Sequence, residues 1–182
     1  MEQRLARLDP DAWEQLIAKA LPEVCRKDKR RRWSQLWNYL NEVLGYVLLA
    51  DRGYTKIRFL DREDEKTPDL LGESEISRAI VEVKTVNPSE DDIDHLNAWP
   101  PIARDMGCGL TGKFKEKLEK TVDGARTQLR GYGEPTDKRI VFLVISLDSG
   151  FKFIEQNYAE LREFIVTHQK PDVELVYQVK IS

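Results

Sequence analysis

The chain has 182 residues, of which 29 are Lys or Arg and 32 are Asp or Glu, so its formal net charge at pH 7 is −3. This balance excludes a uniformly basic, histone-like binder, but it is compatible with a local basic groove beside an acidic metal site. A chain of this length with 41% apolar residues can bury a core of its own, so we expect one globular domain over residues 1–182.

Cysteine usage and the first residues of the chain indicate its compartment. Cys25 and Cys108 form no CxxC pair and no series of metal ligands, which is typical of a reducing compartment. The first residues carry charge and no apolar leader, and no stretch reaches the roughly 20 apolar residues of a membrane span. We therefore expect a cytoplasmic protein with no membrane association.

The predicted elements begin with a helix that starts at Asp9-Pro10. Asp9 suits the N-cap position, and Pro10 suits the first helical position. Because Pro22 has no backbone N–H to donate, this helix is expected to end or break there.

A longer helix is predicted from Trp33 onward. Its apolar residues recur at the 3.6-residue period, and Val43 to Ala50 is apolar nearly all round. We expect that half of the helix to be deeply buried, and Trp33 and Trp37 to anchor the helix in the core. Arg52-Gly53 is expected to end it.

Strands and further helices follow. Alternating and β-branched residues predict three strands, over residues 54–60, 67–71 and 77–86. The chain then predicts a helix ending near 131–133, an almost wholly apolar strand over 139–147, a helix over 153–167 and a strand over 173–181. The order α-α-β-β-β-α-β-α-β predicts an α/β fold with a mixed central sheet flanked by helices.

Residues 87–112 interrupt this pattern between the third strand and the helix that follows it. The interval is acidic and contains Pro and Gly. Segments of this length are often lids or binding loops. Its negative charge would repel a phosphate backbone, so its role stays open between a regulatory lid, a protein contact and disorder.

Charged residues occupy strand positions where charge is costly. Glu82 and Lys84 are two residues apart and therefore project from the same face of their strand, between apolar neighbours. Burial of such charges is expensive unless they are paired or bind a metal. If the segment before this strand pairs with it, Asp69 reaches the same point, and two carboxylates suit Mg²⁺. A surface salt bridge between Glu82 and Lys84 is the alternative that spacing alone leaves open.

Pro68-Asp69 and Glu82-Val83-Lys84, with thirteen positions from Asp69 to Glu82, resemble the signature of the PD-(D/E)XK (restriction-endonuclease-like) nuclease superfamily. The resemblance implies that Asp69, Glu82 and the backbone carbonyl of Val83 bind Mg²⁺, for which Mn²⁺ can substitute. It implies that Lys84 assists the attacking water. This chemistry is coherent, because phosphodiester hydrolysis needs a cation that acidifies water and neutralises developing charge.

The predicted order of elements over residues 33–147 also resembles the core of that superfamily, α-β-β-β-α-β. Many members carry a glutamate on the first core helix that completes the metal shell. Glu42 is the candidate here. An acid on the solvated edge of the helix is the alternative.

A further resemblance concerns the contact with DNA. Gln128 and Tyr132 form a Gln-x-x-x-Tyr pattern that resembles the extra motif of RecB-type and lambda-exonuclease-like members, which implies a contact with backbone phosphate. Lys117 on the same helix, and Arg30 and Arg31 in a run of six cations within seven residues, are further candidates for DNA contacts. Ordinary solvated surface is the alternative for these three cations.

These patterns together predict a metal-dependent deoxyribonuclease that hydrolyses DNA phosphodiester bonds in defence, repair or mobile-element processing. DNA is the expected partner, and a homodimer or a larger nuclease complex is compatible with the resemblance. A catalytically silent nuclease-fold protein that serves as a DNA-binding or protein-assembly module is the alternative from another class. An α/β protein in which the motif is coincidental is the third.

Overall fold

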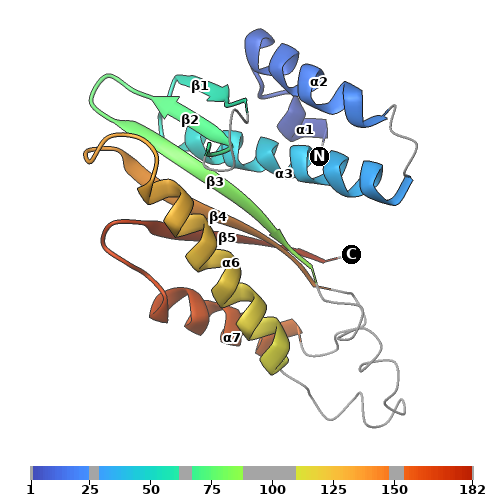
Figure 1. Ribbon diagram of the computed structural model, residues 1–182, viewed down its shortest axis with the longest axis vertical. Helices are drawn as coiled ribbons and strands as arrows, with labels where there is room; N and C mark the ends of the chain where they lie inside the picture. The colour runs from blue at the N-terminus through green and yellow to red at the C-terminus, as the bar shows by residue number, and fades with distance from the viewer. Residues whose placement is uncertain (1, 25–28, 62–66, 88–109, 148–153, 182) are drawn as a thin grey trace.

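The computed structural model describes residues 2–24, 29–61, 67–87, 110–147 and 154–181 (Figure 1). Most of the acidic interval, residues 88–109, therefore lies outside the described residues. In the described ranges, no helix combines the length and the apolar character that crossing a membrane requires.

Five helices and five strands follow one another along the described part of the chain in nearly the expected order. They are α1 (Glu2–Leu5), α2 (Pro10–Val24), α3 (Lys29–Asp51), β1 (Lys56–Phe59), β2 (Leu70–Glu73), β3 (Arg78–Val86), α6 (Gly112–Arg130), β4 (Lys138–Leu147), α7 (Ile154–Thr167) and β5 (Glu174–Ile181). The short helix α1 is an addition that the sequence patterns do not predict.

The strands form one five-stranded sheet in the order β1-β2-β3-β4-β5. β1, β2 and β3 are antiparallel neighbours, whereas β3, β4 and β5 run parallel. Helices α1–α3 lie on one face of the sheet, and α6 and α7 lie on the other (Figure 1). The prediction of an α/β fold with a mixed sheet flanked by helices is confirmed.

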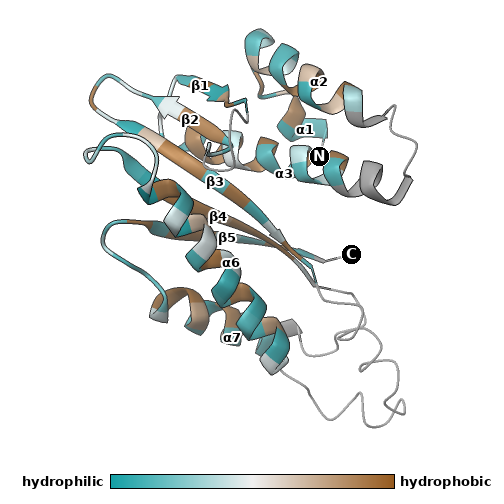
Figure 2. Cartoon of the chain, viewed as in Figure 1, coloured by the Kyte–Doolittle hydropathy of each residue, from teal (hydrophilic) through white to brown (hydrophobic). Residues whose placement is uncertain are grey.

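The sheet separates two apolar cores, which explains the hydropathy of its central strands. β3 and β4 are coloured as hydrophobic along most of their length in Figure 2, and Ile140 to Ile145 are buried. One core lies under α6 and α7 and includes Ile80 and Val86 of β3. The other lies under α2 and α3 and includes Val81 and Val83. Alternate residues of β3 therefore face different helices, as strand geometry requires.

Proline accounts for one difference between the expected and observed strands. β2 begins at Leu70, whereas the sequence pattern places the strand start at Thr67. Pro68 cannot donate a backbone hydrogen bond, so regular pairing starts only after it. Thr67, Pro68 and Asp69 consequently form a buried segment that leads into the strand.

The N-terminal helices also differ from expectation. α2 starts as predicted, because Asp9 Oδ1 accepts a hydrogen bond of 2.7 Å from the Ala12 N–H. Pro22 does not end it, since α2 continues to Val24 with the proline inside its last turn. The expectation that Trp37 lies in the core is wrong, because its side chain is 55% exposed. The side chain of Trp33 lies outside the described residues.

A glycine sets the distance between α3 and the sheet. A Cβ at Gly45 would lie 2.7 Å from Leu70 Cδ1 and 2.9 Å from Val83 Cγ2. The absence of a side chain thus lets α3 pack closely against β2 and β3. These strands carry the residues that the sequence singles out for chemistry.

Candidate active site

Strand pairing places Asp69 against the β3 backbone on both sides of Glu82, as the sequence predicts for segments that pair as neighbours. Leu70 is opposite Val81 in the antiparallel pair of β2 and β3, and Asp69 directly precedes Leu70. The Asp69 N–H donates to the Val81 carbonyl at 3.1 Å. Asp69 Oδ2 accepts a hydrogen bond of 2.8 Å from the Val83 N–H, and the residue is only 2% exposed. The Asp69 carboxylate is therefore fixed against the backbone next to Glu82.

Glu82 is a buried carboxylate with two hydrogen-bond donors. It is 0% exposed, and its Oε1 accepts a hydrogen bond from Lys84 Nζ. Its Oε2 accepts a hydrogen bond of 2.9 Å from Gln128 Nε2. The ion pair of Glu82 and Lys84 exists, but it is not the surface salt bridge of the alternative interpretation, since the acid has no exposed area. Such a buried charge requires compensation.

Lys84 lies between this buried carboxylate and the solvent. Its side chain is 31% exposed, while its ammonium group contacts Glu82. An ammonium in this position can donate to Glu82 on one side and to a water or phosphate oxygen on the other, because it has three donors. The strand parity that predicts a shared face for Glu82 and Lys84 is therefore confirmed.

Gln128 ties two segments of the centre together. Its Nε2 donates to the Thr67 carbonyl at 2.9 Å as well as to Glu82 Oε2. One amide of α6 thus holds both the segment that leads into Asp69 and the acid on β3. The resemblance implies a contact of Gln128 with phosphate; the structure places this side chain against the acidic centre itself.

Tyr132 does not share a helical face with Gln128. α6 ends at Arg130, and Gly131 is its C-cap residue. Tyr132 lies beyond the helix end, half-buried against the core under α6 and α7. The spacing argument for this tyrosine is therefore wrong, because it assumes a helix that continues for two more residues.

Glu42 is buried, so its assignment to a solvated edge is excluded. It is 3% exposed, and its Oε2 lies 3.5 Å from Lys19 Nζ of α2. Lys19 Nζ also donates to the Leu60 carbonyl at 2.6 Å, and the Leu60 N–H donates to the Asp69 carbonyl at 2.9 Å. Glu42 is thus connected to the Asp69 segment through Lys19 and Leu60. Lys19 is a residue of this site that sequence reasoning missed, because no motif or spacing marks it.

The side chains that the structure brings together suit a hard divalent cation that takes two carboxylates from the protein. In the described part of the chain, no three His, Cys, Asp or Glu side chains gather closely enough to hold a metal ion. Glu42 is therefore not brought into one group with Asp69 and Glu82. Mg²⁺ in proteins is commonly bound by one or two carboxylates, with water and substrate phosphate supplying further ligands. Asp69, Glu82 and the Val83 carbonyl fit that smaller set.

Among the other candidate DNA contacts, the structure describes the side chain of Lys117 but not those of Arg30 and Arg31. Lys117 is exposed on α6, and its Nζ donates to the Asn87 carbonyl at 2.7 Å, just beyond the end of β3. Arg30 and Arg31 lie in the first turn of α3, and their side chains are outside the described residues.

No family model matches the chain, and no curated protein matches it. The specific features of the site are the buried carboxylates of Asp69 and Glu82 on adjoining segments, a lysine on the strand of Glu82, and an amide that joins the two segments.

Proposed function

We propose that the chain is a metal-dependent deoxyribonuclease of the PD-(D/E)XK type, which hydrolyses phosphodiester bonds of DNA. The observation that carries this proposal is the burial of Asp69 beside Glu82, with Lys84 bonded to Glu82 at the boundary with solvent. The order α3-β1-β2-β3-α6-β4 supports it, because it is the order that the sequence resemblance implies.

The roles of the residues follow from their positions. Asp69, Glu82 and the Val83 carbonyl would hold Mg²⁺ or Mn²⁺, which when bound acidifies water and neutralises charge on phosphate. Lys84 orients the attacking water or donates to a phosphate oxygen. Glu42, which is paired with Lys19, supports the Asp69 segment from the opposite helix layer.

Cleavage assays with matched variants test this function. Purified protein is incubated with linear, circular and single-stranded DNA in Mg²⁺, Mn²⁺ or EDTA. Asp69→Asn and Lys84→Ala are each expected to reduce the rate at least a hundredfold, since each removes a group that acts on the reacting centre. Glu73→Gln, on the partly exposed far end of β2, is the control and should cleave like the wild type. Equal rates for wild type and Asp69→Asn would contradict the proposal.

One observation favours a catalytically silent protein that binds DNA or assembles with other proteins. Both oxygens of Glu82 already accept hydrogen bonds, from Lys84 and from Gln128, so donors of the protein itself compensate this buried carboxylate. Metal-independent DNA binding without cleavage under every condition of the same assay would favour this second function.

A further inference from the structure

One face of α6 carries a regular series of residues that leads toward the candidate active site. Lys113, Lys117, Lys120, Gly124 and Gln128 follow one another at spacings of four, three, four and four, which places them along one side of the helix. The first four are exposed, and the fifth is the residue that contacts Glu82. We call this series the α6 track.

The other cations of α6 are directed elsewhere. Lys115 pairs with Glu160 of α7 at 2.8 Å, and Arg130 pairs with Asp172 at 2.7 Å. Arg126 is buried and donates to the His168 carbonyl. These three cations therefore do not belong to the track, whereas Lys117 of the track donates to the Asn87 carbonyl at 2.7 Å, just beyond the end of β3.

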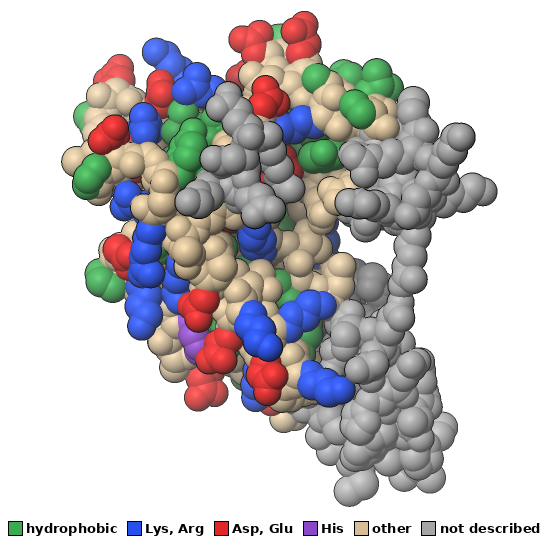
Figure 3. Space-filling model, in the orientation of Figure 1, with side chains coloured by type: hydrophobic (Ala, Val, Ile, Leu, Met, Phe, Trp, Pro, Cys, Tyr) green, Lys and Arg blue, Asp and Glu red, His purple; other side chains and the backbone are tan. Residues whose placement is uncertain are grey.

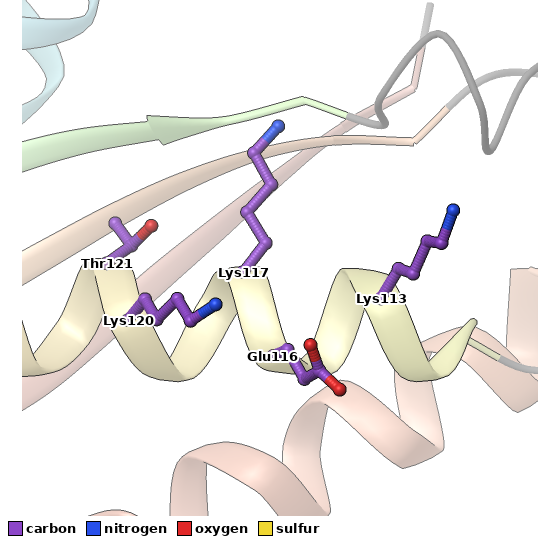
Figure 4. A pocket seen from close by; sticks show the side chains of 5 residues that line it. All are labelled: Lys113, Glu116, Lys117, Lys120 and Thr121. Carbon is purple, nitrogen blue, oxygen red and sulfur yellow. The ribbon is translucent and has the colours of Figure 1, made fainter.

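The lysines of the track border a hollow in the surface. Its volume is about 390 Å³, and it is lined by Lys113, Glu116, Lys117, Lys120 and Thr121. Lys113 and Lys117 project from the helix on the side of the β3 end, whereas Glu116 projects from the other side (Figure 4). Figure 3 shows Lys and Arg side chains with acidic side chains among them over this part of the molecule. Three lysines and one glutamate give the hollow a net positive charge.

The missing side chain at Gly124 is a second feature of the α6 track, and it is independent of the lysines. Glycine in the middle of a helix is unfavourable relative to alanine, so it calls for a reason. Packing supplies none, because a Cβ at Gly124 would have no neighbouring atom within 4 Å. The glycine leaves the helix surface bare between Lys120 and Gln128, where a ligand backbone can approach it closely.

We propose that the α6 track binds the sugar–phosphate backbone of one DNA strand and leads it to Glu82 and Lys84. This inference rests on the proposed function and adds the path of the substrate to it. From Lys113 to Gln128 the helix rises by about 22 Å, so the path is long enough for several successive phosphates of one strand. Lysines supply the charge along the first half of the path, and Gly124 permits close approach before the centre.

DNA binding in EDTA tests the path separately from cleavage. The probe is a fluorescein-labelled 20-base-pair duplex, measured by anisotropy over a series of salt concentrations. The variant Lys113→Ala/Lys117→Ala/Lys120→Ala is expected to bind at least tenfold more weakly at low salt, and its log Kd against log salt slope should fall by about 2–3. The charge-matched control is Lys56→Ala/Lys138→Ala/Lys170→Ala, whose exposed lysines lie outside α6. It should weaken binding less than threefold.

Gly124→Gln provides a test in which stability and binding change in opposite directions. Its Tm should rise by about 1–2 °C, because a good helix former replaces glycine without a clash. Its affinity for the duplex should fall about tenfold, because the new side chain covers the path. Affinity equal to the wild type in this variant, or equal losses in the two lysine triples, would overturn the inference while metal-dependent cleavage still supported the nuclease. A wild type that neither binds nor cleaves DNA would overturn both.

Discussion

Gln128 of α6 and Glu82 of β3 form a hydrogen bond of 2.9 Å that joins the helix to the buried acid of the sheet. The donor is neutral, so it stabilises the carboxylate without cancelling its charge. The same Nε2 holds the Thr67 carbonyl, two residues before Asp69. The position of one acid relative to the other thus depends on a residue far from both in the sequence.

Gln128→Leu is expected to lower the free energy of unfolding by about 1–3 kcal/mol, because Glu82 and the Thr67 carbonyl each lose a donor in a buried environment. Urea denaturation measures this change. Gln156→Leu on α7 is the control, since Gln156 is exposed where it donates to Glu160 at 3.2 Å, and it should have little effect. Equal stability of the two variants would show that the Gln128 contacts contribute nothing to the fold.

The ion pair of Lys19 and Glu42 predicts a large effect of removing one partner. Lys19→Met leaves a carboxylate that is 3% exposed without this cation, so the free energy of unfolding should fall by about 3 kcal/mol. The double variant Lys19→Met/Glu42→Leu should recover part of the loss, because neither charge then remains buried. A double-mutant cycle in urea measures the coupling, and a coupling near zero would exclude the ion pair as a stabilising contact.

Two glycine-to-alanine substitutions are expected to have opposite signs. Gly45→Ala places a Cβ against Leu70 and Val83 and should destabilise the protein by about 1–3 kcal/mol. Gly124→Ala meets no atom within 4 Å and should stabilise it by about 0.5–1 kcal/mol. Thermal unfolding of both variants checks the pair. Stabilisation by Gly45→Ala would contradict the close packing of α3 on the sheet, and destabilisation by Gly124→Ala would contradict the open surroundings of Gly124.

Arg78 and Asp137 predict a pH dependence of stability. Burial alone would raise the pKa of the Asp137 carboxyl, but hydrogen bonds from the Arg78 guanidinium and from the Glu134 N–H hold that pKa below its usual value of 3.8. Because the folded-state pKa is the lower one, the stabilisation is present above the unfolded value and is lost as the pH falls through 3.8 and below.

Asp137→Asn should therefore flatten the decline of the unfolding free energy below about pH 5. Denaturation curves between pH 3 and pH 7 measure this dependence for the variant and for the wild type. Glu75→Gln, at an exposed turn between β2 and β3, controls for the loss of a carboxylate and should keep the wild-type profile. Identical profiles for Asp137→Asn and the wild type would remove Asp137 from the account of acid sensitivity.

The elements of the fold and the pairing of the two acids follow from local patterns. The apolar run of β4 predicts a central strand, and its buried residues confirm this. The two-residue period places Glu82 and Lys84 on one face, and antiparallel pairing of neighbouring segments brings the Asp69 carboxylate to the Val83 N–H between them. These relationships are local or join adjacent strands, so sequence spacing determines them.

The remainder of the site depends on contacts between layers, which periodicity does not encode. Helical spacing predicts a face for Trp37 but not whether another element covers it, and it is exposed. Glu42 pairs with Lys19 on a different helix, and Gln128 donates to Glu82 on the sheet. The end of α6 at Arg130 decides the position of Tyr132. Each of these outcomes is set by how α2, α3 and α6 dock.

Anomalous scattering from crystals soaked in Mn²⁺ tests the central claim most directly, because it locates the cation relative to the two acids. We predict one strong peak about 2.2 Å from oxygens of both Asp69 and Glu82, with the Lys84 ammonium displaced from Glu82 toward solvent. The peak should be absent from crystals of Asp69→Asn. A fully soaked wild-type crystal with no peak between these carboxylates, and with Glu82 still bonded to Lys84 and Gln128, would contradict the proposed metal centre.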